Sequence, residues 1–266
     1  FISLKQQRLR YFPLRNILIR TYLKKHVCRL ISVSDELRKA LEANGIGNVT
    51  TIHNGIDPSS MQVVQSHTER FVQQYRLEKK KCILFGGRIS YLKGAVQLLR
   101  AIRLVAEQIP ESALIVAGPE SRYATDLKKL AADLGIENHI VFTGWIDSNL
   151  LKAAYAASRV VVTPSIYLDP FPTINLEAMA ASRPVIATCF GGSREVVTDG
   201  QTGYIVNPLN TEALAERIMD ILTNDEKGRL MGEAGYKRVQ ELFSLERCAY
   251  RYMALLAHET KIADAS

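Results

Sequence analysis

The feature that most constrains the fold is a strand–helix pattern that repeats along the chain from about residue 82. Short apolar runs rich in branched residues alternate with longer stretches whose apolar residues recur at helical spacing. Runs that are apolar throughout are typical of parallel strands covered by helices on both faces. The pattern therefore predicts an α/β fold, a doubly wound Rossmann-like parallel sheet with right-handed crossovers. The expected strands are 82–85, 113–117, 140–142, 160–162, 185–187 and a weaker one near 204–206, and the expected helices are 123–134, 149–157, 173–182 and most of 210–262.

The first part of the chain follows a different pattern. A basic helix is expected over 14–25, followed by short strands near 29–33 and 49–52. Between the strands, Ser34 is suited to cap a helix whose first turn is acidic, and Gly45 to end it. A turn-rich Asn-Gly-Ile-Asp-Pro sequence then breaks the chain at 54–58. These elements predict a fragment of a second α/β domain over residues 1–57. Because the chain begins with Phe1 rather than Met, we expect it to be part of a longer protein.

Composition and charge argue against several classes of protein. Eight of the 34 lysines and arginines lie in residues 1–30, which contain no acidic residue, so the net charge of +7 is local. In a protein built as a whole to bind nucleic acid, the positive charge would not be confined to one terminal segment. The four cysteines form no CxxC pair and the five histidines show no ligand spacing, so we expect no zinc or other metal site, and a reducing, cytoplasmic setting. No apolar run approaches the roughly 18 residues that cross a bilayer.

The basic segment 8–25 interleaves its charges with aromatic and aliphatic residues. This composition suits peripheral contact with an anionic membrane surface. An ordinary helix that packs its apolar side on the missing part of its domain is the favoured interpretation. Both interpretations stay open at this stage.

Two positive side chains flank the loop after the first strand of the large sheet. Ligands of open parallel sheets bind at the carboxyl ends of strands. Arg88 follows the strand and Lys93 is expected at the start of the next helix, where free N–H groups already favour anions. Gly86 and Gly87 allow the backbone to turn tightly. Two cations at this position suit a diphosphate, although a surface loop with two solvated charges has the same sequence.

Two carboxylates stand near the helix that follows the fourth strand. Asp169 lies in a proline-rich loop before the helix, and Glu177 lies in its first turns among apolar neighbours. The N–H groups near Thr173 and Ile174 are expected to be free to meet a ligand. The two carboxylates are suited to accept hydrogen bonds from several hydroxyls. The alternative is that Asp169 only complements the helix dipole and that Glu177 is an ordinary solvated glutamate.

Asp169 and Glu177, with seven residues between them, resemble the carboxylate pair of retaining glycosyltransferases of family 4, which have the GT-B fold. The resemblance runs from about residue 30 to 243. Its other motifs, in order, are Asn54-Gly55-Ile56-Asp57, Gly87-Arg88 with Lys93-Gly94, Phe142-Thr143-Gly144-Trp145, Leu176-Glu177-Ala178-Met179-Ala180, Pro184-Val185-Ile186-Ala187, Gly191-Gly192-Ser193-Arg194-Glu195-Val196-Val197 and Gly200-Gln201-Thr202-Gly203-Tyr204-Ile205-Val206.

The resemblance implies a role for each residue of the candidate site. Arg88 and Lys93 would bind the phosphates of a nucleotide diphosphate sugar. Asp169 would hold hydroxyls of the transferred sugar, and Glu177 the ribose. These four form the implied catalytic set. The implied donor-binding set adds Gly87, the base-binding residues Gly144, Trp145 and Ile146, and Pro172, Thr173 and Ile174 beside the sugar and phosphate.

Two positions depart from the family pattern. The family usually has glutamate where this chain has Asp169, and often has glycine where this chain has Pro172. Aspartate is one methylene shorter, and proline lacks an N–H. Both departures put the identity of the sugar in doubt more than the reaction.

The implied activity is transfer of a sugar from a nucleotide diphosphate sugar to a carbohydrate or lipid-linked acceptor, with retention and without a cofactor, in glycan, glycolipid or polysaccharide synthesis. The implied domains are an acceptor-side fragment over 1–57, a donor-binding domain over 58–243, and a helix over 244–266 that crosses back to the first part. We expect this helix to turn an apolar face toward residues 1–57. That face comprises Leu245, Cys248, Tyr252, Leu255 and Leu256. The chain as given is expected to bind donor but to transfer sugar poorly, since the acceptor would sit across a cleft against the other domain.

Other functions stay as alternatives. A catalytically inactive nucleotide-sugar-binding module would keep the same residues, and a sugar-nucleotide epimerase could share the fold. A glycosidase also uses two carboxylates, but its chemistry has no need of Arg88 and Lys93. A dehydrogenase is disfavoured because Gly86 and Gly87 are not followed by the GxGxxG spacing.

Overall fold

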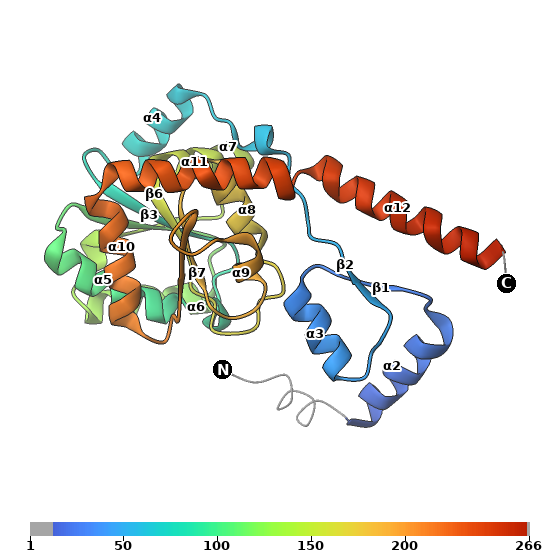
Figure 1. The fold of residues 1–266 in the computed structure, drawn as a ribbon. Helices are drawn as coiled ribbons and strands as arrows, with labels where there is room; N and C mark the ends of the chain where they lie inside the picture. Colours follow the sequence, from blue (N-terminus) through green and yellow to red (C-terminus); the bar gives the residue numbers. More distant parts are fainter. Residues whose placement is uncertain (1–12, 265–266) are drawn as a thin grey trace.

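The computed structural model describes residues 13–264. Figure 1 shows a large body built on a six-stranded sheet, a smaller body built on two strands, and a long C-terminal helix that reaches from the first toward the second. Both sheets are parallel throughout. Among the described helices, none combines the length and the apolar character needed to cross a membrane.

The large sheet has the strand order β5-β4-β3-β6-β7-β8. All six predicted strands are confirmed, and each extends beyond its expected bounds by one or two residues at one or both ends. The strands are β3 (Lys81–Gly86), β4 (Ser112–Ala117), β5 (Ile140–Gly144), β6 (Ser158–Thr163), β7 (Val185–Thr188) and β8 (Gly203–Val206). The central strands are buried on both faces, as their uninterrupted apolar runs require.

Helices cover both faces of this sheet. On one face, α5 (Ala95–Gln108), α6 (Arg122–Asp133) and α10 (Thr211–Thr223) enclose one apolar core. On the other, α4 (Gln65–Gln74), α7 (Ser148–Ala157), α8 (Thr173–Ala180) and α11 (Asp225–Leu242) enclose a second, together with the short α9 (Ser193–Val196). Three 3-10 turns complete the body: η1 (Pro58–Met61), η2 (Tyr91–Lys93) and η3 (Glu137–His139).

The helix expected over 173–182 is shorter than predicted. Helix α8 ends at Ala180, and Ser182 then adopts a left-handed backbone with a φ of 54°. The chain turns there because Pro184 must enter β7 in an extended conformation. The turn places Arg183 just before β7, at the amino ends of the strands.

The smaller body contains α2 (Pro13–His26), β1 (Leu30–Ser32), α3 (Asp35–Ala43) and β2 (Val49–Thr51). Ser34 caps α3 as predicted, with its hydroxyl oxygen accepting a hydrogen bond from the Leu37 N–H at 3.1 Å. Gly45 follows the helix with a φ of +76°. The short strands pair in parallel from Leu30 with Val49 to Ser32 with Thr51.

Helix α12 (Leu245–Asp264) packs against the smaller body. Arg251 Nη2 donates to the Thr51 carbonyl at 2.8 Å, and Arg29 Nε donates to Glu259 Oε1 at 3.0 Å. This packing was predicted, but the contact face was partly wrong. Leu245 and Leu256 are 54% and 58% exposed.

The contact face of α12 is instead a stripe of half-buried residues at helical spacing. The stripe comprises Cys248, Tyr252, Leu255 and Glu259. The last residue of the stripe is Glu259, whose carboxylate forms the ion pair with Arg29. Domain boundaries at residues 57 and 243 stay a prediction.

Candidate active site

The order of the large sheet creates a switch point. From β3 the chain proceeds to β4 and β5 on one side, and then returns to β6, β7 and β8 on the other. The carboxyl ends of β3 and β6 are therefore neighbours from which the chain leaves in opposite directions. Open α/β sheets bind their ligands at this point. The loops that follow β3 and β6 are the two that carry the predicted site residues.

The loop after β3 presents one free cation. Gly87 has a φ of +97°, which turns the chain away from the strand. Arg88 then lies exposed, with no side-chain hydrogen bond or ion pair to any described residue. Lys93 was expected to begin the next helix, but it ends η2 instead. Gly94, with a φ of +76°, separates it from α5.

Lys93 and Asp169 meet across the switch point. Lys93 Nζ donates to Asp169 Oδ2 at 2.6 Å, and Ser165 Oγ donates to the same oxygen at 3.3 Å. Asp169 is only 5% exposed. Burial alone would lower the pKa of Lys93, but the hydrogen bond and charge of Asp169 outweigh it, so the pKa lies above its ordinary value. Lys93 is therefore fully charged at neutral pH.

Backbone contacts hold the loops around this ion pair together. The Ile166 N–H donates to the Leu92 carbonyl at 2.8 Å, which joins the loops after β6 and β3. The Gly192 N–H donates to the Asp169 carbonyl at 2.9 Å, which adds the loop after β7. Gly94 fits so closely that a Cβ there would lie 1.8 Å from the Pro164 carbonyl oxygen.

Glu177 has a partner, Tyr155, that was not predicted from the sequence. The Tyr155 hydroxyl donates to Glu177 Oε2 at 2.8 Å. Tyr155 is fully buried, and burial, followed by the charge of Glu177, raises its pKa well above the ordinary value. The phenol therefore keeps its proton and orients the carboxylate. A hint was available, because a tyrosine on the apolar side of an alanine-rich helix needs a partner for its hydroxyl.

The start of α8 is held by a buried polar chain. Thr163 Oγ1 donates to Asn175 Oδ1 at 2.9 Å, and Asn175 Nδ2 donates to Ser193 Oγ at 3.4 Å. Thr173 and Ile174 are the first two residues of the helix, so their N–H groups lack helical partners. Pro172 is the N-cap residue and makes no side-chain capping bond. Sequence reasoning missed Asn175, which fixes where these N–H groups point.

The residues expected at the base lie on the flank of the site. Gly144, with a φ of +69°, ends β5, and Trp145 after it is 75% exposed. Ile146 is half-buried. Two strand spacings separate β5 from β3, so this loop lies about 10 Å from the carboxyl end of β3. The structure thus brings Lys93 and Asp169 into contact and places Arg88, Glu177 and the Trp145 loop around them without direct contact.

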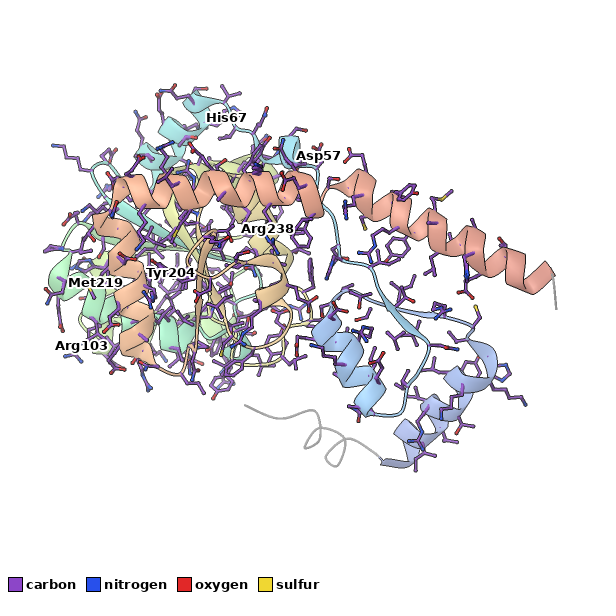
Figure 2. All side chains as sticks on the ribbon, viewed as in Figure 1. Asp57, His67, Arg103, Tyr204, Met219 and Arg238 are labelled. Carbon is purple, nitrogen blue, oxygen red and sulfur yellow. The ribbon has the colours of Figure 1, made fainter. Side chains whose placement is uncertain are left out.

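A second cluster of titratable groups joins the two bodies. Glu195 accepts hydrogen bonds from the Asp35 and Glu36 N–H groups at the start of α3, at 2.8 and 2.9 Å. Its Oε2 also lies 2.8 Å from His53 Nε2. Burial would raise the pKa of Glu195, but the hydrogen bonds from His53 and α3 outweigh it and lower the pKa. Arg238 on α11 (Figure 2) donates to the Glu195 carbonyl at 2.9 Å and so supports the residue from behind.

Within residues 13–264, Asp35, His53 and Glu195 are the group whose side chains could together offer ligand atoms to a metal ion, all within 4.8 Å of one another. Glu195 is already engaged by α3 and His53, and Asp35 Oδ1 by Thr51 and Arg38. The arrangement is that of a satisfied polar contact between the bodies. The expectation of no metal and no cofactor stays a prediction.

Comparison with known proteins identifies the family. The family model described as glycosyl transferases group 1 matches residues 67–238. The chain is 31% identical over 230 residues to the uncharacterized glycosyltransferase MJ1607 of Methanocaldococcus jannaschii, covering 84% of the chain and 58% of that protein. It is 29% identical over 187 residues to a GDP-mannose-dependent alpha-(1-6)-phosphatidylinositol monomannoside mannosyltransferase of Mycolicibacterium smegmatis, covering 68% of the chain and 49% of that protein.

Solved structures agree with this result. The fold resembles that of sucrose-phosphate synthase from Thermosynechococcus elongatus with a TM-score of 0.84 and 26% identity, covering 99% of the chain and 67% of that structure. This likeness confirms the predicted α/β fold of the GT-B type. The chain spans about three fifths of the length of the first curated relatives it matches. Because the family match covers well over half of the chain, the chain belongs to the group 1 glycosyltransferases.

Proposed function

We propose that this chain binds the donor for an enzyme that moves a sugar, with retention, from a nucleotide diphosphate sugar to a carbohydrate or lipid-linked acceptor. The observation that carries the proposal is the 2.6 Å contact between Lys93 and Asp169 at the switch point. It joins a cation suited to a diphosphate with a carboxylate suited to sugar hydroxyls. The GDP-mannose-dependent relative supports a donor of this class. In this proposal residues 1–57 belong to the acceptor-side domain and residues 58–243 form the donor-binding domain.

The charges account for the chemistry proposed. When the bond between sugar and phosphate breaks, negative charge develops on the departing nucleotide diphosphate. Arg88 and Lys93 stand where they would stabilise that charge, and the free N–H groups of Thr173 and Ile174 add to it. Asp169 would bind the hydroxyls of the transferred sugar, while Glu177, held by Tyr155, would bind the ribose. The base would lie toward Trp145.

Asp169→Ala should separate sugar binding from nucleotide binding. We expect about ten- to a hundredfold weaker binding of the nucleotide diphosphate sugar, because a charge-assisted hydrogen bond contributes roughly 1.5–3 kcal/mol. Binding of the bare nucleotide diphosphate should stay equal or become tighter, since Lys93 loses its competing partner. Isothermal titration calorimetry with UDP, GDP and their sugars measures both and also identifies the base. Glu107→Ala, an exposed carboxylate on α5, is the control. Equal losses for sugar nucleotide and bare nucleotide would contradict the assignment.

Donor hydrolysis separates the proposed enzyme from a module that only binds. The full-length protein should slowly release free sugar from its donor even without acceptor, because water can replace the acceptor hydroxyl. An inactive binding module would bind the donor and release nothing. An epimerase would convert the donor without cleaving it, so the product nucleotide sugar would be detected instead.

We also propose that α2 contacts an anionic membrane surface. Ile17, Leu18 and Tyr22 on this helix are 48%, 69% and 63% exposed, beside the exposed cations Lys24 and Lys25. An exposed apolar surface with basic residues suits the interface of an anionic bilayer. The remainder of the predicted segment, residues 8–12, lies outside the described part. The alternative is that another part of the protein covers this surface.

Liposome co-sedimentation tests the membrane contact. We expect binding to vesicles that contain phosphatidylglycerol and none to pure phosphatidylcholine. Each lysine near an anionic surface contributes about 1 kcal/mol, so Lys24→Gln with Lys25→Gln should weaken binding about thirtyfold. The matched pair Lys128→Gln with Lys129→Gln, on exposed positions of α6, should change little. Equal binding to both kinds of vesicle, or none to either, would exclude the contact.

A further inference from the structure

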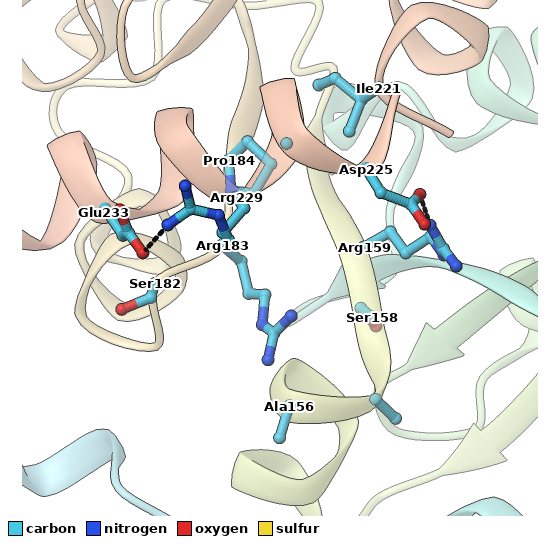
Figure 3. A pocket seen from close by; sticks show the side chains of 12 residues that line it. Ala156, Ser158, Arg159, Ser182, Arg183, Pro184, Ile221, Asp225, Arg229 and Glu233 are labelled. Atoms are coloured by element: carbon cyan, nitrogen blue, oxygen red, sulfur yellow. Dashed lines mark hydrogen bonds and ion pairs between the residues drawn. The ribbon is translucent and has the colours of Figure 1, made fainter. Parts of the chain in front are cut away.

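A cavity of about 520 Å³ opens at the edge of the large sheet opposite the candidate active site. Its walls come from the amino ends of β6 and β7, the end of α7, and the helices α10 and α11 (Figure 3). Helix α8 runs between the two edges: it begins at Thr173 in the candidate active site, and Ser182, in the turn after its end, lies beside the cavity. The cavity has the size of a small-molecule site.

Three arginines line the cavity, and two of them are paired. Arg159 contacts Asp225. Arg229 donates to Glu233 at 2.6 Å and to Glu226 at 2.7 Å. Both contacts join residues at the surface, and Figure 3 shows these pairs on either side of the cavity.

Arg183, the third arginine, has no partner. Its side chain extends into the cavity between α11 and the start of β6 (Figure 3). The Nε atom is shut off from solvent and forms no hydrogen bond, and the guanidinium makes no ion pair with any described residue. Burial lowers the pKa of Arg183, yet a guanidinium stays charged at any physiological pH. A half-buried charge without a partner is costly, and a bound anion would offset that cost.

The backbone around Arg183 is fixed in advance. The Arg183 N–H donates to the Ala178 carbonyl at 2.8 Å, and Ser182 is held at a φ of 54°. Gly232 on α11 approaches so closely that a Cβ there would lie 2.1 Å from the Ser182 carbonyl oxygen. Pro184 restrains the other side. Because the turn is rigid, a ligand would not have to order it, which favours binding.

We propose that this cavity binds a phosphate monoester of a small hydroxylated molecule. The planar guanidinium of Arg183 matches two oxygens of a phosphate. The cavity is larger than a bare anion requires, and Asp225 and Glu233 at its rim keep exposed oxygens that can accept hydrogen bonds from hydroxyls. The site is separate from the donor site, so the inference does not depend on the proposed function.

Calorimetry with glucose 6-phosphate tests the inference. The protein carries Arg88→Gln and Lys93→Gln, which remove the two cations of the proposed donor site. In this background we expect one site for glucose 6-phosphate, at least tenfold weaker binding after Arg183→Gln, and less than twofold change after Arg103→Gln. Arg103, on α5 (Figure 2), is the matched control because it lies outside the cavity and pairs with Glu107. Arg183→Gln removes an unpaired charge and should not lower the unfolding temperature.

A second measurement reads the residue directly. The Nε–H signal of Arg183 in a nitrogen–proton correlation spectrum, assigned by its loss in Arg183→Lys, should shift on addition of glucose 6-phosphate and not of glucose. Gluconate, which offers a carboxylate instead, should bind at least tenfold more weakly. An unmoved signal, or equal affinity before and after Arg183→Gln, would overturn the site. If gluconate bound as tightly as glucose 6-phosphate, the choice of phosphate would be wrong. If glucose did so, no anion would be needed.

Discussion

Arg88→Ala weakens binding of a nucleotide diphosphate by about ten- to a hundredfold, if the donor site lies where we propose. Arg88 is exposed and has no protein partner to lose, so its removal leaves the fold intact and takes away only its contact with the phosphates. A charge-assisted hydrogen bond of this kind contributes roughly 1.5–3 kcal/mol. Calorimetry gives the affinity, and thermal unfolding should be unchanged.

Lys93→Ala should cause a similar loss with one added effect. Its removal leaves the nearly buried Asp169 without its cation, so this variant should also unfold at a lower temperature. The difference between the two variants separates a ligand contact from a structural ion pair. Arg103→Ala is the control for the loss of one positive charge. Wild-type affinity in both site variants would show that the phosphates bind elsewhere.

Gly94→Ala should disrupt both the fold and donor binding. The residue has a φ of +76°, which costs a non-glycine residue about 1–2 kcal/mol, and its new Cβ would lie 1.8 Å from the Pro164 carbonyl oxygen. Relieving that overlap costs about 1–3 kcal/mol more. We therefore expect the free energy of unfolding to fall by about 2–5 kcal/mol. The loops after β3 and β6 must also move apart, which pulls Lys93 away from Asp169.

Gly135→Ala is the matched control for this effect. Gly135 has a nearly equal φ of +70°, but a Cβ there would meet nothing within 4 Å. The free energy of unfolding of Gly135→Ala should fall only by the cost of the backbone conformation, and the variant should keep its affinity for the donor. Urea denaturation and calorimetry of both variants measure the two effects. If Gly94→Ala lost no more stability than Gly135→Ala, the close approach to Pro164 would have no energetic weight.

The sheet could be predicted from the sequence because its strands are buried on both faces. Burial on both faces requires uninterrupted apolar runs such as 113–117, and a run of that kind is visible without knowing its neighbours. The bounds of α8 and the contact face of α12 were predicted less well. Both depend on what the helix meets in space, as in the turn at Ser182 and the contact with Arg29.

The candidate site could be predicted in part for the same reason. Arg88, Lys93, Asp169 and Glu177 follow strand ends, and parallel topology brings strand ends to one edge. Their partners could not be predicted. Lys93 and Asp169 are 76 residues apart, and nothing local specifies that they touch.

The lack of a partner for Arg183 could not be predicted from the sequence either. Whether an arginine has a partner depends on every side chain around it. A neighbouring carboxylate in the sequence says nothing about whether the two groups meet. Only the folded chain reveals a charge that no residue neutralises.

The connection between the two bodies determines how they can move. The chain passes between them twice, and the two passages are bonded to each other: the Ile56 N–H donates to the Phe243 carbonyl at 2.9 Å, and the Leu245 N–H donates to the Ile56 carbonyl at 3.1 Å. With both covalent links pinned at one place, the bodies can rotate only about that pivot. Helix α12 must swing with the smaller body, since Arg251 and Glu259 fasten it there. The bonds from Glu195 to α3 are then the first to break in any such rotation.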